Sequence, residues 1–154
     1  MNPATNLAYL MQHLAAVMGR QSDQLLQEQL GIGISQFKIL MVLEWNPRIQ
    51  QRAIADSLGQ TEASISRQIK LLKAKKLLQT KLDPQNRRRH ITTPTPLGMQ
   101  VTEAASDILR RSLSPDFASL GDDKLLQMAT GLQHIHRLIC RPGKLGACDH
   151  QLGF

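Results

Sequence analysis

The sequence is poor in aromatic residues and in cysteine. Aromatic side chains make up 3% of the 154 residues, whereas 42% of the residues are hydrophobic. The core must therefore be built from Leu, Ile, Met, Val and Ala, a composition that favours helices over a β-sandwich. Two cysteines do not make a disulfide framework, and they suit a reducing cytoplasm.

Segments for membrane insertion and motifs for catalysis are also missing from the sequence. No apolar run reaches about 18 residues, which excludes a transmembrane helix, and the N-terminus lacks the pattern of a secretory signal. No phosphate-binding glycine loop, nucleophile elbow or His-Glu-x-x-His motif is found. We therefore expect one domain, or one protomer of an oligomer, that is cytoplasmic and not an enzyme, with no cofactor and no membrane partner.

The positive charge is concentrated in the middle of the chain. Between Gln36 and His90, twelve Lys and Arg residues stand against four Asp and Glu residues, so this segment carries +8 while the remainder carries −1. A solvated basic face is one interpretation. An excess confined to one third of the chain also indicates a module that binds a polyanion, flanked by neutral segments.

Four helices are predicted before the centre of the chain. Apolar residues at steps of three and four predict a first helix over residues 4–30, ended by Gly31. Ser35 is expected to cap a second helix over residues 36–45. A short helix over 52–58, a turn at Gly59 and a helix from the cap at Thr61 to about residue 75 follow. The last two helices have the spacing of a helix-turn-helix.

A basic β-hairpin is predicted directly after the helix-turn-helix. Residues 77–82 and 89–93 have the character of strands, and Asp83-Pro84-Gln85-Asn86 is typical of a turn. Three consecutive arginines, Arg87 to Arg89, then lie at the hairpin tip. A helix-turn-helix followed by a basic hairpin is the order of a winged helix.

Two further helices are predicted in the C-terminal third. Thr95-Pro96 is a start signal for a helix that runs to about Leu113, where Ser114-Pro115 is expected to interrupt it. Asp122-Asp123 opens a last helix that ends near Arg141. The predicted organisation is an N-terminal dimerisation helix (1–30), a winged helix-turn-helix (34–94), C-terminal dimerisation helices (95–141) and a flexible tail (142–154). The fold class is mainly α with a small β wing.

The helix after Thr61 is the candidate reader of DNA bases. Ile65, Ile69 and Leu72 share one side and are expected to face the core, which turns the opposite side to solvent. Small residues near the start let a helix approach the major groove, and a long donor such as Arg reaches guanine. The predicted contacts are bases for Ala63, Ser64 and Arg67, the minor groove for Arg87 and Arg88, and the DNA backbone for Thr61, Lys70 and Arg89.

These motifs resemble the MarR (multiple antibiotic resistance regulator) family of bacterial transcription factors. The resemblance covers residues 34–99 in motif detail: Ser35, Phe37 and Leu40 before the reading unit, the small-Ser-Arg helix, and Asp83-Pro84-Gln85-Asn86-Arg87-Arg88 followed by Pro94-Thr95-Pro96-Leu97-Gly98. Asn86 replaces the family's wing aspartate, so an ion pair to a wing arginine is in doubt unless Asp83 compensates. Pro94 removes a backbone donor from the returning strand.

The resemblance implies a homodimer on a pseudo-palindromic operator, with one reading helix in each half-site. The apolar stripes of the terminal helices agree, because a lone winged helix cannot cover them. We expect the regulator to act as a repressor rather than an activator. The resemblance also implies a small aromatic effector bound between the dimerisation helices and the winged helix. Tyr9, His13, Met41 and Trp45 are candidates to line that pocket, although core packing suits Met41 and Trp45 better.

Two alternatives remain open at this point. The basic charge serves a nonspecific architectural DNA-binding protein equally well. A metal- or redox-sensing regulator is the other alternative, because His136 and Cys140 lie one helical turn apart and Cys148 and His150 follow them. An ordinary packed thiol and surface histidines explain the same residues.

Overall fold

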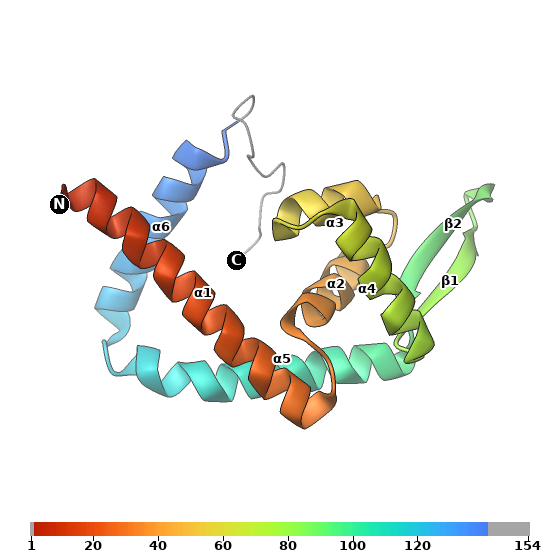
Figure 1. Ribbon diagram of the computed structural model, residues 1–154, viewed down its shortest axis with the longest axis horizontal. Coiled ribbons are helices and arrows are strands. Elements are labelled where there is room, and N and C mark those ends of the chain that lie inside the picture. The colour runs from red at the N-terminus through yellow and green to blue at the C-terminus, as the bar shows by residue number, and fades with distance from the viewer. Residues whose placement is uncertain (1, 142–154) are drawn as a thin grey trace.

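A computed structural model describes residues 2–141 of the chain (Figure 1). It is mainly helical with one small antiparallel sheet, which confirms the predicted winged helix-turn-helix. The elements are α1 (Pro3–Leu30), α2 (Ile34–Trp45), α3 (Gln51–Leu58), α4 (Glu62–Ala74), β1 (Leu78–Asp83), β2 (Asn86–Pro94), α5 (Pro96–Ala118) and α6 (Asp122–Ile139). None of the helices within residues 2–141 is both long and apolar enough to cross a membrane.

Most helix ends follow the predicted local chemistry. The side chains of Thr61 and Thr95 accept hydrogen bonds from the N–H groups of Ser64 and Gly98, respectively. Gly59 ends α3 in the left-handed region at φ 63°, where glycine has no steric penalty. These caps explain why α3, α4 and α5 begin or end within a residue or two of the predicted positions.

The predicted N-cap of α2 is wrong. The helix begins at Ile34 with Gly33 at the cap position, so Ser35 lies inside the first turn. Asp23 of α1 accepts the hydrogen bond from the Ile34 N–H at 2.9 Å. A carboxylate from a neighbouring helix thus satisfies the donor that a local serine was expected to satisfy.

The predicted interruption at Ser114-Pro115 is also wrong, because α5 continues through Pro115 to Ala118. Proline removes one intrahelical hydrogen bond, to the carbonyl group four residues earlier, that of Arg111. Arg111, Ser112 and Ser114 are exposed, so water can solvate the carbonyl group that loses its partner. The helix tolerates the proline here because the local backbone faces solvent.

The core lies inside the winged helix and under the C-terminal half of α1. Its largest fully buried side chains are Leu26, Ile32, Ile39, Leu40, Ile54, Ile65 and Leu72. Helix α2 is at the centre of this packing, since it contacts α1, α3, α4, α5 and β2. Figure 1 shows α1 crossing α5 and the β-hairpin projecting on the opposite side of the molecule from α6.

The wing contains an irregularity that the sequence did not reveal. Regular pairing runs from Leu78 opposite Pro94 to Leu82 opposite His90, and then Asp83 pairs with Asn86. Three residues, Arg87 to Arg89, therefore lie between the partners of Leu82 and Asp83. We call these three residues the arginine bulge. Pro94 pairs at the end of the ladder, where its missing N–H shortens the sheet without dividing it.

Candidate nucleic-acid interface

Helix α4 divides into a buried face and a solvent face, as predicted. Ile65, Ile69 and Leu72 are between 0% and 4% exposed. On the other side Ala63, Arg67 and Lys70 are exposed. Within residues 2–141 the guanidinium of Arg67 forms no hydrogen bond or ion pair, so all of its donors face solvent. The fold thus turns Ala63, Arg67 and Lys70, three of the side chains of α4 that were expected to reach DNA, toward solvent.

A polar cluster buttresses the start of α4 against α2. Ser35 Oγ and Ser64 Oγ both donate to Gln60 Oε1, at 3.1 and 3.2 Å, and Gln60 Nε2 lies 2.7 Å from Ser35 Oγ. Ser64 is therefore half-buried and engaged within the fold rather than fully presented to solvent. Sequence reasoning missed Gln60, because nothing in the turn sequence indicates that its amide contacts a residue 25 positions earlier.

A second polar contact joins α2 to the middle and the end of α4. The buried Gln36 donates from Nε2 to Gln68 Oε1 at 2.9 Å and accepts from Lys75 Nζ at 3.2 Å. Lys75 also donates to the carbonyl oxygen of Gly31, just after α1. Lys75 thus joins the linker between α1 and α2 to the C-terminal end of α4.

Arg87 and Arg88 are exposed at the wing, and within residues 2–141 neither side chain has a hydrogen-bonding partner. Asn86, which replaces the family's aspartate, accepts a hydrogen bond on Oδ1 from the Arg88 N–H at 3.1 Å. Asn86 thus shapes the backbone of the arginine bulge while leaving the arginine side chains to solvent.

Asp83 forms the ion pair of the wing, with a partner that the sequence did not indicate. Arg48, in the loop between α2 and α3, donates from Nε to Asp83 Oδ2 at 3.2 Å and from Nη2 to Oδ1 at 3.1 Å. These hydrogen bonds, with a further one from the Gln85 N–H, lower the pKa of Asp83, and the same pairing raises the pKa of Arg48. Asp83 was expected to form the ion pair with a wing arginine that Asn86 cannot form. It pairs instead with Arg48, which lies outside the hairpin.

Arg89 also contacts Arg48. Its Nη2 donates to the Arg48 carbonyl oxygen at 2.7 Å. A guanidinium has five N–H donors, so this contact leaves others for solvent or a ligand. Arg89 therefore differs from Arg87 and Arg88 in being partly engaged within the fold.

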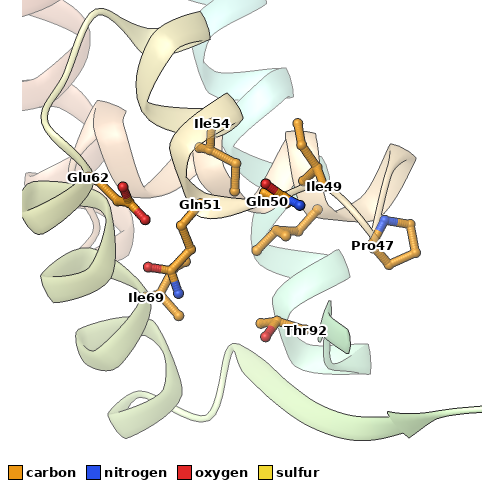
Figure 2. Close-up of a pocket in the computed structure, with 9 residues that line it drawn as sticks. Pro47, Ile49, Gln50, Gln51, Ile54, Glu62, Ile69 and Thr92 are labelled. Atoms are coloured by element: carbon orange, nitrogen blue, oxygen red, sulfur yellow. The ribbon is translucent and has the colours of Figure 1, made fainter. Parts of the chain in front are cut away.

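A cavity of about 510 Å³ lies between the α2–α3 loop, α3, α4 and β2 (Figure 2). Pro47 and Ile49 of the loop line it together with Glu62 of α4 and Thr92 of β2. Open volume thus lies between Pro47 and Ile49 of this loop and Thr92 of the wing.

A larger apolar groove of about 710 Å³ lies between α1, the end of α5 and α6. Leu7, Leu10 and Leu14 of α1 line it and are 45–51% exposed. Lys38 of α2 and Ser22 of α1 supply polar atoms to the lining. None of the four effector candidates lines the groove. Tyr9 and His13 are exposed, and Met41 packs against the core as expected.

The expectation of core packing for Trp45 is wrong, because its side chain is 84% exposed. Trp45 is the last residue of α2, beyond the point where that helix is covered by its neighbours. Position at a helix end, rather than residue type, decides its exposure.

The candidate metal site is only partly within the described residues. His136 and Cys140 lie at the end of α6 and are half-buried, whereas Cys148 and His150 lie outside the described residues, as does the predicted tail. Among residues 2–141, no group of three or more His, Cys, Asp or Glu side chains is arranged to hold a metal ion.

Comparisons with known proteins bear on this geometry. The MarR family model matches residues 30–89, which include the helix-turn-helix and most of the wing. The structure of the MepR–DNA complex of Staphylococcus aureus is similar, with a TM-score of 0.68 and 27% identity over 83% of this chain and 94% of that chain. The chain carries a MarR-family winged helix.

Other solved structures share the same fold. The transcriptional regulator BldR of Sulfolobus solfataricus has a TM-score of 0.72 and 25% identity, over 90% of this chain and all of that chain. The MarR-family protein Rv2887 of Mycobacterium tuberculosis, solved with p-aminosalicylic acid, has a TM-score of 0.71 and 18% identity, over 84% of this chain and 97% of that chain. No curated protein sequence matches the chain.

The MarR resemblance predicted from the sequence is therefore confirmed, and with it the general class of transcriptional regulator. Members of this family are regulators rather than enzymes. The structural relatives also span the terminal helices, since they cover far more of the chain than the family model does.

Proposed function

We propose that this MarR-family chain forms a homodimer that binds a pseudo-palindromic DNA operator and represses transcription until a small effector binds. The observation that carries the proposal is the joint presentation of unpaired arginines on α4 and on the wing. Such a regulator acts on chromosomal DNA, which in a bacterial cell lies in the cytoplasm.

Helix α4 is proposed to read base edges in the major groove. Arg67 is exposed and has no partner among the described residues, so it loses no internal contact on binding guanine O6 and N7. Ala63 is small and exposed one turn earlier, which lets the helix backbone approach the bases. Ser64 lies in the same first turn of α4 and is also proposed to contact a base.

The wing is proposed to enter the minor groove through Arg88, with Arg87 beside it. Both are exposed at the arginine bulge. A narrow minor groove has a strong negative potential that attracts guanidinium groups. Thr61, Lys70 and Arg89 flank these elements and are proposed to contact phosphates, with Arg89 using donors beyond the one bound to Arg48.

Dimerisation is proposed through the terminal helices. Leu10 and Leu14 of α1 and Met128 and Leu132 of α6 line the apolar groove and are roughly half exposed. Pairing two copies about a two-fold axis would remove these apolar surfaces from water. The same pairing would place two α4 helices at half-sites about 34–36 Å apart, one turn of DNA.

The effector is proposed to be a small aromatic molecule bound at the end of the groove that meets the winged helix, where Ile34 and Lys38 of α2 line it. The partner would cover the other part of the groove, at Leu10 and Leu14. The complex of Rv2887 with p-aminosalicylic acid supports this class of ligand. The lining joins apolar side chains to Lys38 of α2, which would suit an aromatic acid. An effector can change DNA affinity only if it binds the two states of the dimer unequally.

A mobility-shift assay with a salt titration tests the DNA-binding part. A dimer that neutralises about 8 phosphates should give a slope near −7 for log K against log salt concentration. Absence of binding at low salt would refute the regulator. Comparison of selected and random duplexes separates this proposal from an architectural DNA-binding protein, which binds both equally.

A further inference from the structure

Arg48 contacts both ends of the arginine bulge. Its guanidinium binds the two carboxylate oxygens of Asp83, which pairs with Asn86 just before the bulge. Its carbonyl oxygen accepts from Arg89, the last residue of the bulge. One residue of the α2–α3 loop therefore binds the wing on either side of Arg87 and Arg88.

The contact with Asp83 is built into the fold rather than formed on the surface. The Asp83 side chain is 3% exposed, whereas that of Arg48 is 42% exposed. Asp83 Oδ1 also accepts from the Gln85 N–H at 2.9 Å, which holds the hairpin turn. A buried carboxylate that loses its partner is costly, so the wing is strongly favoured in the position that keeps Arg48 in contact.

Apolar packing does not replace this contact at the outer part of the wing. The neighbours of Arg48 in sequence, Pro47 and Ile49, face a cavity of about 510 Å³ that Thr92 of β2 also lines (Figure 2). Leu82 of β1, next to Asp83, is 55% exposed. The hydrogen bonds of Arg48 therefore join the outer part of the hairpin directly to the α2–α3 loop.

We propose that Arg48 is a positioning residue for DNA binding, which fixes the direction in which the arginine bulge presents Arg87 and Arg88. This inference rests on the proposed DNA-binding function. It assigns to Arg48 an effect on affinity without a contact to DNA.

The competing explanation is that Arg48 binds a phosphate directly, since its side chain is partly exposed. The two explanations predict opposite changes in DNA affinity when Asp83 is replaced. Replacing Asp83 by Asn removes a negative charge near DNA, so a purely electrostatic effect would strengthen binding. Loss of wing positioning would weaken it.

The experiment measures anisotropy of labelled duplexes of about 30 bp, long enough for two half-sites, selected from a random pool by the wild-type protein. The variants are Arg48→Gln, Asp83→Asn, the double variant, and Arg48→Lys, which keeps the charge but loses the two-point contact. Arg20→Gln is the matched control, because Arg20 is an exposed arginine of α1 that is remote from the wing.

We expect both single variants to weaken binding to the selected duplex by about 5- to 50-fold, the range of one well-placed base contact. The double variant should bind no more weakly than the weaker single variant, because the two residues form one unit. The salt slope should change by the same amount in Arg48→Gln and in Asp83→Asn, since both variants displace the same wing arginines. Arg48→Lys should fall between Arg48→Gln and the wild type, and Arg20→Gln should match the wild type.

Two results would overturn the inference. One is a salt slope reduced by about 0.9 in Arg48→Gln with unchanged or tighter binding by Asp83→Asn, which would make Arg48 a phosphate ligand. The other is unchanged affinity in both single variants. Failure of the wild-type protein to select any duplex would instead refute the proposed function.

Hydrogen exchange of the unbound protein separates positioning from general unfolding. In Arg48→Gln, amide protection should fall at residues 86–91 and stay constant in α4 and α5. Equal loss of protection across α4 would assign the weaker binding to destabilisation of the whole winged helix and would contradict the proposal.

Discussion

Gly98 lies directly against the backbone carbonyl group of Leu77. A Cβ atom added at Gly98 would come closer than 3.0 Å to the Leu77 carbonyl oxygen, which already accepts a hydrogen bond from the Thr95 N–H at 3.0 Å. The first turn of α5 is thereby packed onto the segment that connects α4 to β1. This close approach joins α4, the wing and α5 at one point.

We therefore expect Gly98→Ala to destabilise the fold by about 1–3 kcal/mol, because the opposing atom is backbone and cannot turn away. Urea unfolding followed by circular dichroism measures the change. Gln100→Ala is the control: Gln100 is exposed on α5 two residues after Gly98, so its replacement should change the stability by less than about 0.5 kcal/mol. Equal stability of Gly98→Ala and wild type would contradict the packing described here.

Arg67→Ala is expected to reduce affinity selectively. The loss should be about 1–3 kcal/mol on a selected duplex and small on random DNA, because a base contact is lost. Lys70→Ala serves as the comparison, since the loss of a phosphate contact lowers affinity equally on both duplexes and reduces the salt slope by about 1. Anisotropy titrations on the two duplexes make the measurement, and an equal loss for Arg67→Ala on both would favour an architectural DNA-binding protein.

Leu14→Glu is expected to dissociate the proposed dimer. Leu14 lines the apolar groove and is 46% exposed in the single chain, so pairing would bury an unpaired carboxylate in each protomer, at a cost of about 3–5 kcal/mol. Sedimentation velocity measures the outcome. Leu71→Glu, at a comparably exposed apolar residue of α4 outside the terminal helices and the groove, should leave the oligomeric state unchanged. A dimer that persists in Leu14→Glu would place the interface elsewhere.

Acid is expected to remove the stabilisation that Asp83 provides. Its pKa is lowered, mainly by hydrogen bonds from Arg48, so the ionised form favours the folded state. That stabilisation is complete above the ordinary value of 3.8 and is lost as the pH falls through the lower folded-state pKa. The difference in unfolding free energy between wild type and Asp83→Asn should therefore be constant near neutral pH and shrink below pH 3.8. Denaturant unfolding across this range provides the test, and a difference that does not change with pH would sink the assignment.

Local chemistry predicted the order and ends of most elements. Threonines before α4 and α5, glycines after α1 and α3, and the periodic apolar residues of α4 act over one or two turns, so they can be recognised in the sequence alone. The solvent-facing position of Arg67 follows from the same periodicity. The two wrong helix boundaries, at Ser35 and Pro115, arose where a distant carboxylate or solvent replaced the local partner.

The contacts that position the candidate interface could not be predicted in this way. Gln60 meets Ser35 across 25 positions, Gln36 meets Gln68 across 32, and Arg48 meets Asp83 across 35. Each pair consists of ordinary polar residues without a spacing that marks them as partners. The arginine bulge is likewise set by strand register, which depends on pairing with another segment.

The sequence by itself determined which segments become helices and strands, where the positive charge gathers and which family the winged helix belongs to. Only the tertiary structure decided that Arg48 binds the wing, that Trp45 is exposed and that the apolar faces of α1 and α6 border an open groove. The physical reason is one of range: capping and periodicity operate between neighbours along the chain, whereas burial and ion pairing depend on which distant segments the packing of α2 brings together.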